Sequence, residues 1–200
     1  IKIKNHCKPE ENDVIVVSSI EHSSISKHII RSLNERGYTI ILIPVLPNGI
    51  INLIEFENIL VTYKDRIVMI SCMLVNNEIG IIQPVKEMVL LTKTIKNTII
   101  FHSDCGSGIQ MIRDFEKEYL PDIVTCSCYK FGGPHNGLLL SNISEQLKEK
   151  NYGTHDVFSM YFAALSVKHY IKVYHELEIK NNELKIILTN IAKKMFSENG

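Results

Sequence analysis

Short apolar runs alternate with amphipathic stretches along the first three quarters of the chain. Runs rich in β-branched residues predict buried strands, and apolar residues spaced three and four apart predict helices. The predicted strands are Val14–Ser18, Thr39–Val45, Arg66–Met73, Thr98–His102 and Asp122–Ser127, followed by a short apolar run at Gly137–Ser141. The predicted helices are Ser24–Arg36, Leu53–Tyr63 and Val85–Ile95. This alternation indicates βαβ units, and therefore an α/β protein with a mainly parallel sheet flanked by helices.

The pattern changes near His155. Asp156–Phe196 has helical spacing, no strand pattern, and charge clusters such as Glu176–Lys180. It predicts a long C-terminal helix that could break near Lys180–Asn182. We therefore divide the chain into residues 1–154, which form the sheet domain, and residues 155–200, a helical segment.

Charge and hydropathy exclude some classes of function. Lys plus Arg and Asp plus Glu both number 22, so the basic face that nucleic-acid binding requires is not expected. No apolar run reaches the 18 residues that suggest a membrane span, and the polar start has no signal-peptide core. We expect a cytoplasmic protein. The missing initiator Met is what a fragment or a processed chain would show.

The cysteines do not predict a disulfide framework or a metal site. There are five, at scattered positions: Cys7, Cys72, Cys105, Cys126 and Cys128. Their odd number differs from a secreted framework. Cys126 and Cys128 are too close together for a zinc knuckle, and no second pair accompanies them. We interpret them as reduced thiols, some of them buried, and predict no metal.

Polar side chains gather where the predicted strands end. They are His22, Asn76–Asn77, Asp104 and Ser127. In parallel sheets, ligands bind beyond the carboxyl ends of the strands, so these positions are where a site is expected. Each is ambiguous alone: Asp104 could cap a helix, and the two Asn could form a turn.

Lys130 follows the predicted strand Asp122–Ser127 and precedes Phe131-Gly132-Gly133-Pro134. A lysine held between a strand end and a rigid turn can be partly desolvated, which lowers its pKa and makes the amine nucleophilic. A lone loop lysine is more often simply solvated. Asp104 could serve as the counter-ion of a buried cation such as a pyridinium nitrogen.

Taken in order, these residues resemble the class V aminotransferase family, and within it the NifS-like cysteine desulfurases. The segments that carry the resemblance are Glu21–His22, Arg36–Tyr38 with Asn48–Gly49, Val75–Gly80 with Gln83–Pro84, His102–Asp104, and Ser127–Lys130 with Gly133–Pro134. The similarity extends more weakly to Gly153–Thr154. Val75–Gly80 (VNNEIG) with Gln83–Pro84 is the most specific of these segments.

The resemblance implies a cofactor, pyridoxal 5'-phosphate, and a role for each site residue. Lys130 would hold the cofactor as a Schiff base, and Asp104 would pair with its pyridine nitrogen. His22 would stack on the ring and assist proton transfer. Asn77 would lie near the phenolic oxygen, where Ser107 stands in place of the family's Gln. Ser127 would bind the phosphate, and Thr154 would reach the phosphate in the partner subunit of a homodimer.

The chain also departs from the family. Tyr129 replaces a His, Asn151 replaces an Arg, and Ser107 is shorter than the family's Gln. Residues 1–154 would be the central part of the large domain of a pyridoxal-phosphate-dependent transferase. Residues 155–200 would lead towards a small domain, with its persulfide-forming Cys, that is missing here. Cys105 and Cys128 align with small wall residues of the family.

Three functions stay open. One is a cysteine desulfurase, which takes sulfur from L-cysteine to give alanine and an enzyme persulfide, and which would pass the sulfur to an acceptor protein. The second is a truncated or degenerate protein that binds the cofactor without turnover. The third is a related class V enzyme, such as a selenocysteine lyase or an aminotransferase.

Overall fold

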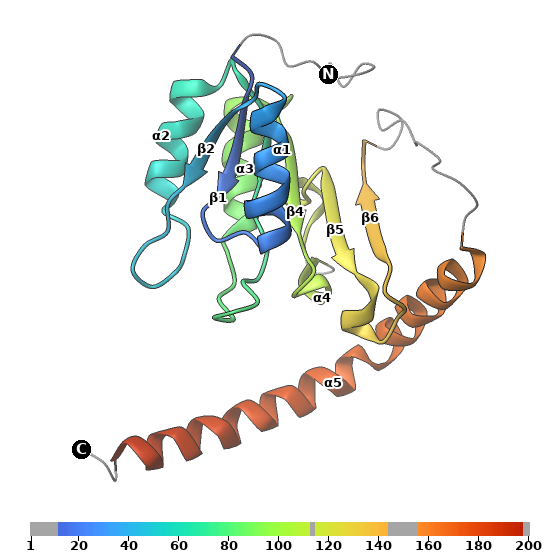
Figure 1. The fold of residues 1–200 in the computed structure, drawn as a ribbon. Helices are drawn as coiled ribbons and strands as arrows, with labels where there is room; N and C mark the ends of the chain where they lie inside the picture. Colours follow the sequence, from blue (N-terminus) through green and yellow to red (C-terminus); the bar gives the residue numbers. More distant parts are fainter. Residues whose placement is uncertain (1–11, 113–114, 144–155, 198–200) are drawn as a thin grey trace. The chain divides into compact units, whose positions relative to one another are not determined.

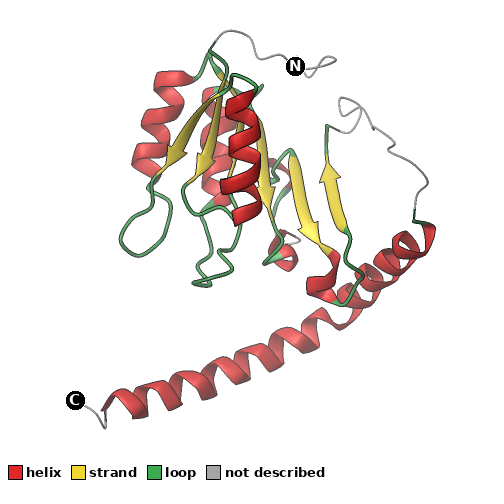
Figure 2. Cartoon of the chain, in the orientation of Figure 1, coloured by secondary structure: helices red, strands yellow, loops and turns green. Residues whose placement is uncertain are grey.

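The computed structural model describes residues 12–112, 115–143 and 156–197. These residues belong to two compact units, which are described one at a time. The first comprises residues 1–127 and 137–155, and the second comprises residues 128–136 and 156–200. Figures 1 and 2 show the helices and strands of both.

The first unit is built on a six-stranded sheet with the strand order β2-β1-β3-β4-β5-β6. Its strands are β1 (Val14–Ser18), β2 (Thr39–Ile43), β3 (Ile67–Ser71), β4 (Ile100–Asp104), β5 (Ile123–Ser127) and β6 (Gly137–Ser141). The first five strands pair in parallel, and β6 runs antiparallel to β5. Parallel neighbours need crossover connections, and the helices supply them.

Helices cover both faces of the sheet (Figure 1). They are η1 (Ser24–Ile29, a π-helical turn), α1 (Ile30–Glu35), α2 (Leu53–Tyr63), α3 (Val85–Ile95), α4 (Ile109–Ile112) and η2 (Lys117–Tyr119). Side chains alternate along β1: Val14 and Val16 pack in the cluster that includes Phe56 of α2 and Met88 of α3. Ile15 and Val17 instead pack with Ile25 of η1 and with residues of α1. Because both faces of the sheet are covered by helices, the strands carry apolar side chains on both faces.

The predicted α/β fold is confirmed, with small differences at the element ends. Helices α2 and α3 have the predicted bounds, as do β1 and β6. The predicted strand Thr98–His102 is wrong by two residues, because β4 runs from Ile100 to Asp104. Asp104 is therefore the last residue of the strand itself. The short helices α4 and η2 were not predicted, since four and three residues leave too little periodicity to detect.

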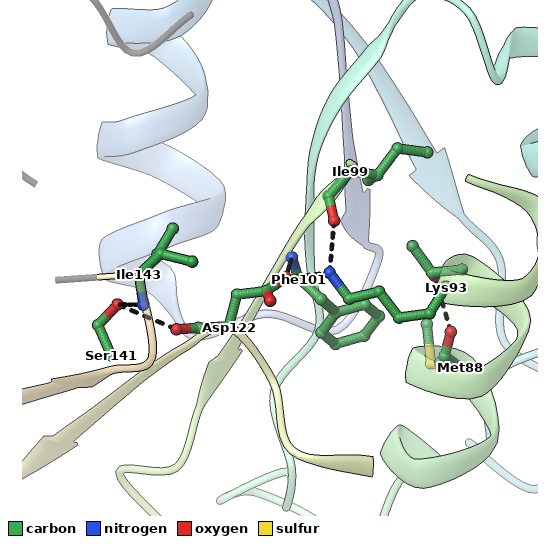
Figure 3. A network of polar contacts seen from close by, with 8 residues as sticks. Met88, Lys93, Ile99, Phe101, Asp122, Ser141 and Ile143 are labelled. Carbon is green, nitrogen blue, oxygen red and sulfur yellow. Dashed lines mark hydrogen bonds and ion pairs between the residues drawn. The ribbon is translucent and has the colours of Figure 1, made fainter. Parts of the chain in front are cut away.

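Asp122 joins three elements at the amino end of β5 (Figure 3). Its Oδ2 accepts hydrogen bonds from Lys93 Nζ of α3 at 2.5 Å and from the Phe101 backbone amide of β4 at 2.8 Å. Lys93 also donates to the carbonyl oxygen of Ile99. The Asp122 side chain is only 11% exposed, so its charge depends on these partners.

The second unit contains the turn η3 (Cys128–Phe131) and the long helix α5 (Val157–Ser197). The predicted break near Lys180–Asn182 is wrong, because α5 continues through these residues. An Asn inside a helix costs only about 0.7 kcal/mol relative to Ala, and the flanking Glu, Leu and Lys residues have high helix propensity that offsets this cost. Among the described residues, no helix is long and apolar enough to cross a membrane.

Replacing Asp122 with Ala should lower the free energy of unfolding by about 3 kcal/mol, because it leaves the partly buried Lys93 ammonium and the buried Phe101 amide without their acceptor. Urea unfolding of the purified chain measures this. The exposed pair Arg31–Glu35 provides the control, and Arg31→Ala should change stability by less than about 1 kcal/mol. Equal losses in the two variants would contradict the structural role of Asp122.

Candidate functional site

The carboxyl ends of four adjacent strands carry predicted site residues. His22 follows β1, Asn77 follows β3, Asp104 ends β4 and Ser127 ends β5. Because β1, β3, β4 and β5 are parallel neighbours, these four positions share one edge of the sheet. The first unit therefore brings them to a common edge, as the sequence predicted.

The strand order reverses direction between β1 and β3. From β1 the chain crosses to β2 on one side, and then returns to β3 on the other side. The chain leaves β1 and β3 towards opposite sides of the sheet. In open parallel sheets, ligands usually bind at such a switch point. One loop carries Glu21 and His22, and the other carries Asn76 and Asn77.

The His22 ring is exposed and has a defined orientation. Its Nδ1 accepts a hydrogen bond from the Ser24 backbone amide at 3.3 Å and lies 2.9 Å from the Ser24 hydroxyl. The ring proton of the neutral form is therefore on Nε2. The His22 carbonyl accepts the first bonds of η1, from the amides of Ile25 and Ser26. Ser24 is a site-orienting residue that the sequence did not reveal.

Asn76 and Asn77 have different roles. Asn76 is buried, and its Oδ1 accepts bonds from the amides of Glu78 and Ile79, while its Nδ2 donates to the carbonyl of Ile20. Asn76 thus forms the turn and joins the two loops of the switch point. Asn77 is exposed, so its amide faces outward from a loop that its neighbour holds.

Gln83, in the Gln-Pro part of the VNNEIG…QP segment, has a structural role. It is buried, its Oε1 accepts from the Ile51 amide, and its Nε2 donates to the carbonyl of Gly49. Gly49 has φ +79°, and a Cβ there would lie 2.8 Å from Ile81 Cδ1. The Gln and the Gly, which are 34 residues apart, therefore pack the loop after β2 against the loop after β3.

Asp104 is half-buried, and one carboxylate oxygen, Oδ1, accepts from the Gly106 amide at 2.8 Å. This contact forms a local turn, not a helix cap. Ser107, in the same loop, and Ser127, at the end of β5, are both half-buried. His102, two residues before Asp104 on β4, points to the same face of the sheet and completes this region.

His102 links strand β4 to β3 and β5. Its Nδ1 lies 2.9 Å from Ser71 Oγ of β3, and its Nε2 lies 2.9 Å from Thr125 Oγ1 of β5. Burial lowers the pKa of His102, and the Asp104 carboxylate opposes this effect. The ring is therefore neutral at pH 7, with one nitrogen donating and the other accepting. The H-x-D spacing indicated His102, but its hydroxyl partners come from strands that are distant in sequence.

Glu21 is a buried carboxyl group at the switch point. Its Oε1 accepts from Ser18 Oγ and from the Met73 amide, both at 2.6 Å. Burial raises the pKa of Glu21 to about 7, although these two hydrogen bonds lower it, and Asp104 contributes a further increase. The sequence analysis gave this residue no role beyond its place in the motif.

Lys130 belongs to the second unit, in the turn η3, and follows Ser127 by three residues. The expected partial desolvation is not seen, because Lys130 is exposed. The turn itself is rigid: the Gly133 amide donates to the Cys128 carbonyl, and a Cβ on Gly133 would lie 2.8 Å from Cys128 Cβ. Only Gly fits there. Thr154, predicted to bind phosphate, lies outside the described residues.

The described thiols are buried: Cys72, Cys105, Cys126 and Cys128. Burial raises the pKa of Cys105 to about 12, and raises the pKa of Cys72 well above its ordinary value. Thiolates are the reactive form, so these two thiols are poor nucleophiles. Cys105 and Cys128, interpreted from the sequence as wall residues, are both buried. In the part of the chain that is described, no His, Cys, Asp and Glu side chains cluster in a group suited to a metal ion.

With the fold and the residues at its carboxyl edge described, comparison with known proteins identifies the family. The chain belongs to the aminotransferase class-V family, which it matches over residues 2–175. A cysteine desulfurase IscS of Rickettsia massiliae is 34% identical over 125 residues, which is 62% of this chain and 29% of the relative. The IscS of Rickettsia akari is 35% identical over the same length.

Solved structures have the same fold. A NifS-like protein superposes with a TM-score of 0.71 at 23% identity, over 82% of this chain and 47% of the other. The NifS-like protein of Rickettsia africae superposes with a TM-score of 0.61 at 27% identity, over 87% of this chain and 51% of the other. The chain thus spans about half the length of these structures and less than a third of the curated relatives.

The raised pKa of Glu21 makes stability depend on pH. Between pH 4.5 and about 7, the Glu21 carboxyl group keeps its proton in the folded chain and loses it in the unfolded chain. The free energy of unfolding should therefore fall by about 3 kcal/mol as the pH rises through this range, and Glu21 should add no slope above it. Urea unfolding across the range tests this.

Other groups titrate in the same range, so the prediction concerns the difference between the wild type and Glu21→Gln. Gln cannot ionise, and the variant should lack the Glu21 part of the slope. Parallel stability curves for the two proteins would contradict the assignment.

Proposed function

We propose that this chain is the cofactor-binding part of a NifS-like cysteine desulfurase that uses pyridoxal 5'-phosphate. In this reaction an enzyme thiol takes the sulfur atom of L-cysteine to become a persulfide, and L-alanine is released. The observation that carries the proposal is the set of residues at the carboxyl edge of β1, β3, β4 and β5, together with the family match. The curated relatives it resembles are named cysteine desulfurases.

The chemistry of the residues in the first unit suits such a cofactor. A pyridinium nitrogen is stabilised by a carboxylate partner, and Asp104 at the end of β4 can provide that carboxylate. An aromatic ring needs a flat partner, and His22 has an exposed imidazole whose orientation Ser24 sets. The exposed amide of Asn77 and the half-buried hydroxyls of Ser107 and Ser127 provide polar contacts for oxygen atoms.

The roles proposed for these residues follow from their chemistry. Bound pyridoxal phosphate supplies an electron sink that weakens the bonds next to the amino group of the substrate. Asp104 holds the proton on the pyridine nitrogen. His22 stacks and can carry a proton on Nε2, since its Nδ1 is occupied. Lys130 supplies the amine that attaches the cofactor. Because Lys130 is exposed in the chain alone, the bound cofactor and substrate would have to desolvate it.

Four further features of the proposal rest on the sequence and on the resemblance to the family. They are a homodimer in which Thr154 reaches the phosphate in the partner subunit, a sulfur-acceptor protein, a cytoplasmic location, and a division into residues 1–154 of the large domain and the segment 155–200. Each stays a prediction.

The cofactor assignment predicts that the purified chain binds pyridoxal phosphate and gains the near-ultraviolet to visible absorption band of a conjugated lysine adduct. Borohydride reduction should then fix the pyridoxyl group on the peptide that contains Lys130, which mass spectrometry identifies. Lys130→Ala should abolish the covalent adduct, whereas Lys185→Ala, an exposed lysine of α5, should not. Labelling of another lysine in the wild type would refute the assignment.

A second candidate function is cofactor binding without sulfur transfer by these 200 residues. The observation that favours it is that the four described cysteines are buried, with raised pKa values at Cys72 and Cys105. It predicts negligible sulfide release from L-cysteine in the presence of cofactor and a reducing thiol, measured by a colorimetric sulfide assay. Robust release that Cys105→Ala abolishes would show that a buried thiol does accept sulfur.

A further inference from the structure

Glu21 is buried, 7% exposed, at the switch point between β1 and β3. Its Oε1 accepts two hydrogen bonds, one from each side of this point: Ser18 is the last residue of β1, and Met73 follows β3. Among the described residues, Glu21 Oε2 is the buried side-chain polar atom that has no hydrogen-bond partner. A buried polar atom without a partner is rare, and its cost requires a reason.

The two loops at this point are joined twice. Glu21 bonds the Met73 amide, and Asn76 bonds the Ile20 carbonyl at 3.1 Å. The residues proposed to contact the cofactor, His22 and Asn77, each directly follow one of the joining residues in the chain. The position of either side chain therefore depends on whether these loops stay joined.

We propose that Glu21 is a positioning residue that, by joining the loop after β1 to the loop after β3, fixes where His22 and Asn77 lie. The proposal rests on the proposed function for what these two side chains bind, but the link between the loops is independent of it. The neutral carboxyl group suits this position. Its Oε1 keeps both acceptor contacts, and an O–H at Oε2 can donate to a buried water or to a polar atom of a ligand.

In the described part of the chain, the ionisable groups that interact with Glu21 are the carboxyl group of Asp104 and the thiols of Cys72 and Cys105, whose raised pKa values keep them neutral near pH 7. Asp104 at the end of β4 raises the pKa of Glu21. The thiols of Cys72, after β3, and Cys105, after β4, also sense the charge of Glu21. Ionisation would bury a negative charge beside Asp104, so the ionised carboxylate gains hydration when the loops separate. The joined loops should consequently open more often as the pH rises through neutrality.

Hydrogen exchange of the full chain without cofactor tests the link. Segments 19–24 and 72–78 of the wild type should lose about tenfold protection between pH 6 and pH 8, after correction for intrinsic exchange rates, because one proton is coupled to opening. Glu21→Gln, which cannot ionise, should show no such change. Asp122→Asn removes a buried carboxylate at the opposite edge of the sheet, and should keep the wild-type pH dependence. An identical pH dependence in the wild type and Glu21→Gln would overturn the proposal.

Cofactor affinity gives the second measurement. Pyridoxal phosphate is titrated into each protein at pH 6.5 and pH 8, and binding is followed by absorbance. Between these pH values the wild type should lose more affinity than Glu21→Gln, and Glu21→Ala should bind at least tenfold more weakly than the wild type at pH 6.5. If Glu21→Ala does not fold, the comparison of the wild type with Glu21→Gln still decides.

The two measurements separate the failure of the proposal from that of the proposed function. Exchange as expected without any cofactor binding would leave the link between the loops supported and refute the proposed function. Wild-type affinity in Glu21→Ala, with unchanged exchange in both loops, would refute the positioning role and leave the proposed function standing.

Discussion

The parallel pairing of β1, β3, β4 and β5 is the constraint on which the site depends. Parallel neighbours cannot be joined by hairpins, so each strand must be followed by a crossover, and every crossover begins at the same edge. The residues that follow the strands are therefore collected at that edge even though His22 and Ser127 are more than a hundred residues apart. Strand order then places the loops of His22 and Asn77 next to each other, at the switch point between β1 and β3.

Hydrogen bonds from buried side chains hold these loops in place. Asn76 shapes its own turn, and Gln83 fastens the loop after β2. Glu21 fastens the loop after β1 to the loop after β3. Each of these side chains is buried and hydrogen-bonds to backbone groups. Replacing one of them would therefore displace the neighbouring loop residues as well as remove the hydrogen bonds. The exposed residues that would contact a ligand are thus adjacent in sequence to buried residues that position them.

The opposite edge of the sheet has a different kind of stabilisation. There Asp122 neutralises Lys93 and satisfies the amide of Phe101 (Figure 3). The two buried carboxyl groups have different partners: Asp122 has the Lys93 ammonium within hydrogen-bond distance, whereas Glu21 has a hydroxyl group and a backbone amide. Burial, with a further contribution from Asp104, raises the pKa of Glu21, so this group suits the neutral form.

The sequence by itself determined the α/β class, most strand and helix positions, and the candidate residues. These follow from local patterns: β-branched runs, helical spacing, and polar residues at strand ends. Single residues within the motifs could not be separated in this way, and Asn76 and Asn77 looked alike until the structure buried one and exposed the other.

Only the tertiary structure decided the strand order, and with it the switch point. It also showed that His102 bonds Ser71 of β3 and that Glu21 bonds Met73 in the loop after β3, since contacts across 31 or 52 residues leave no local signature. The unpartnered oxygen of Glu21 is a property of the packed fold, because burial, and not residue type, determines whether a carboxyl group keeps its proton.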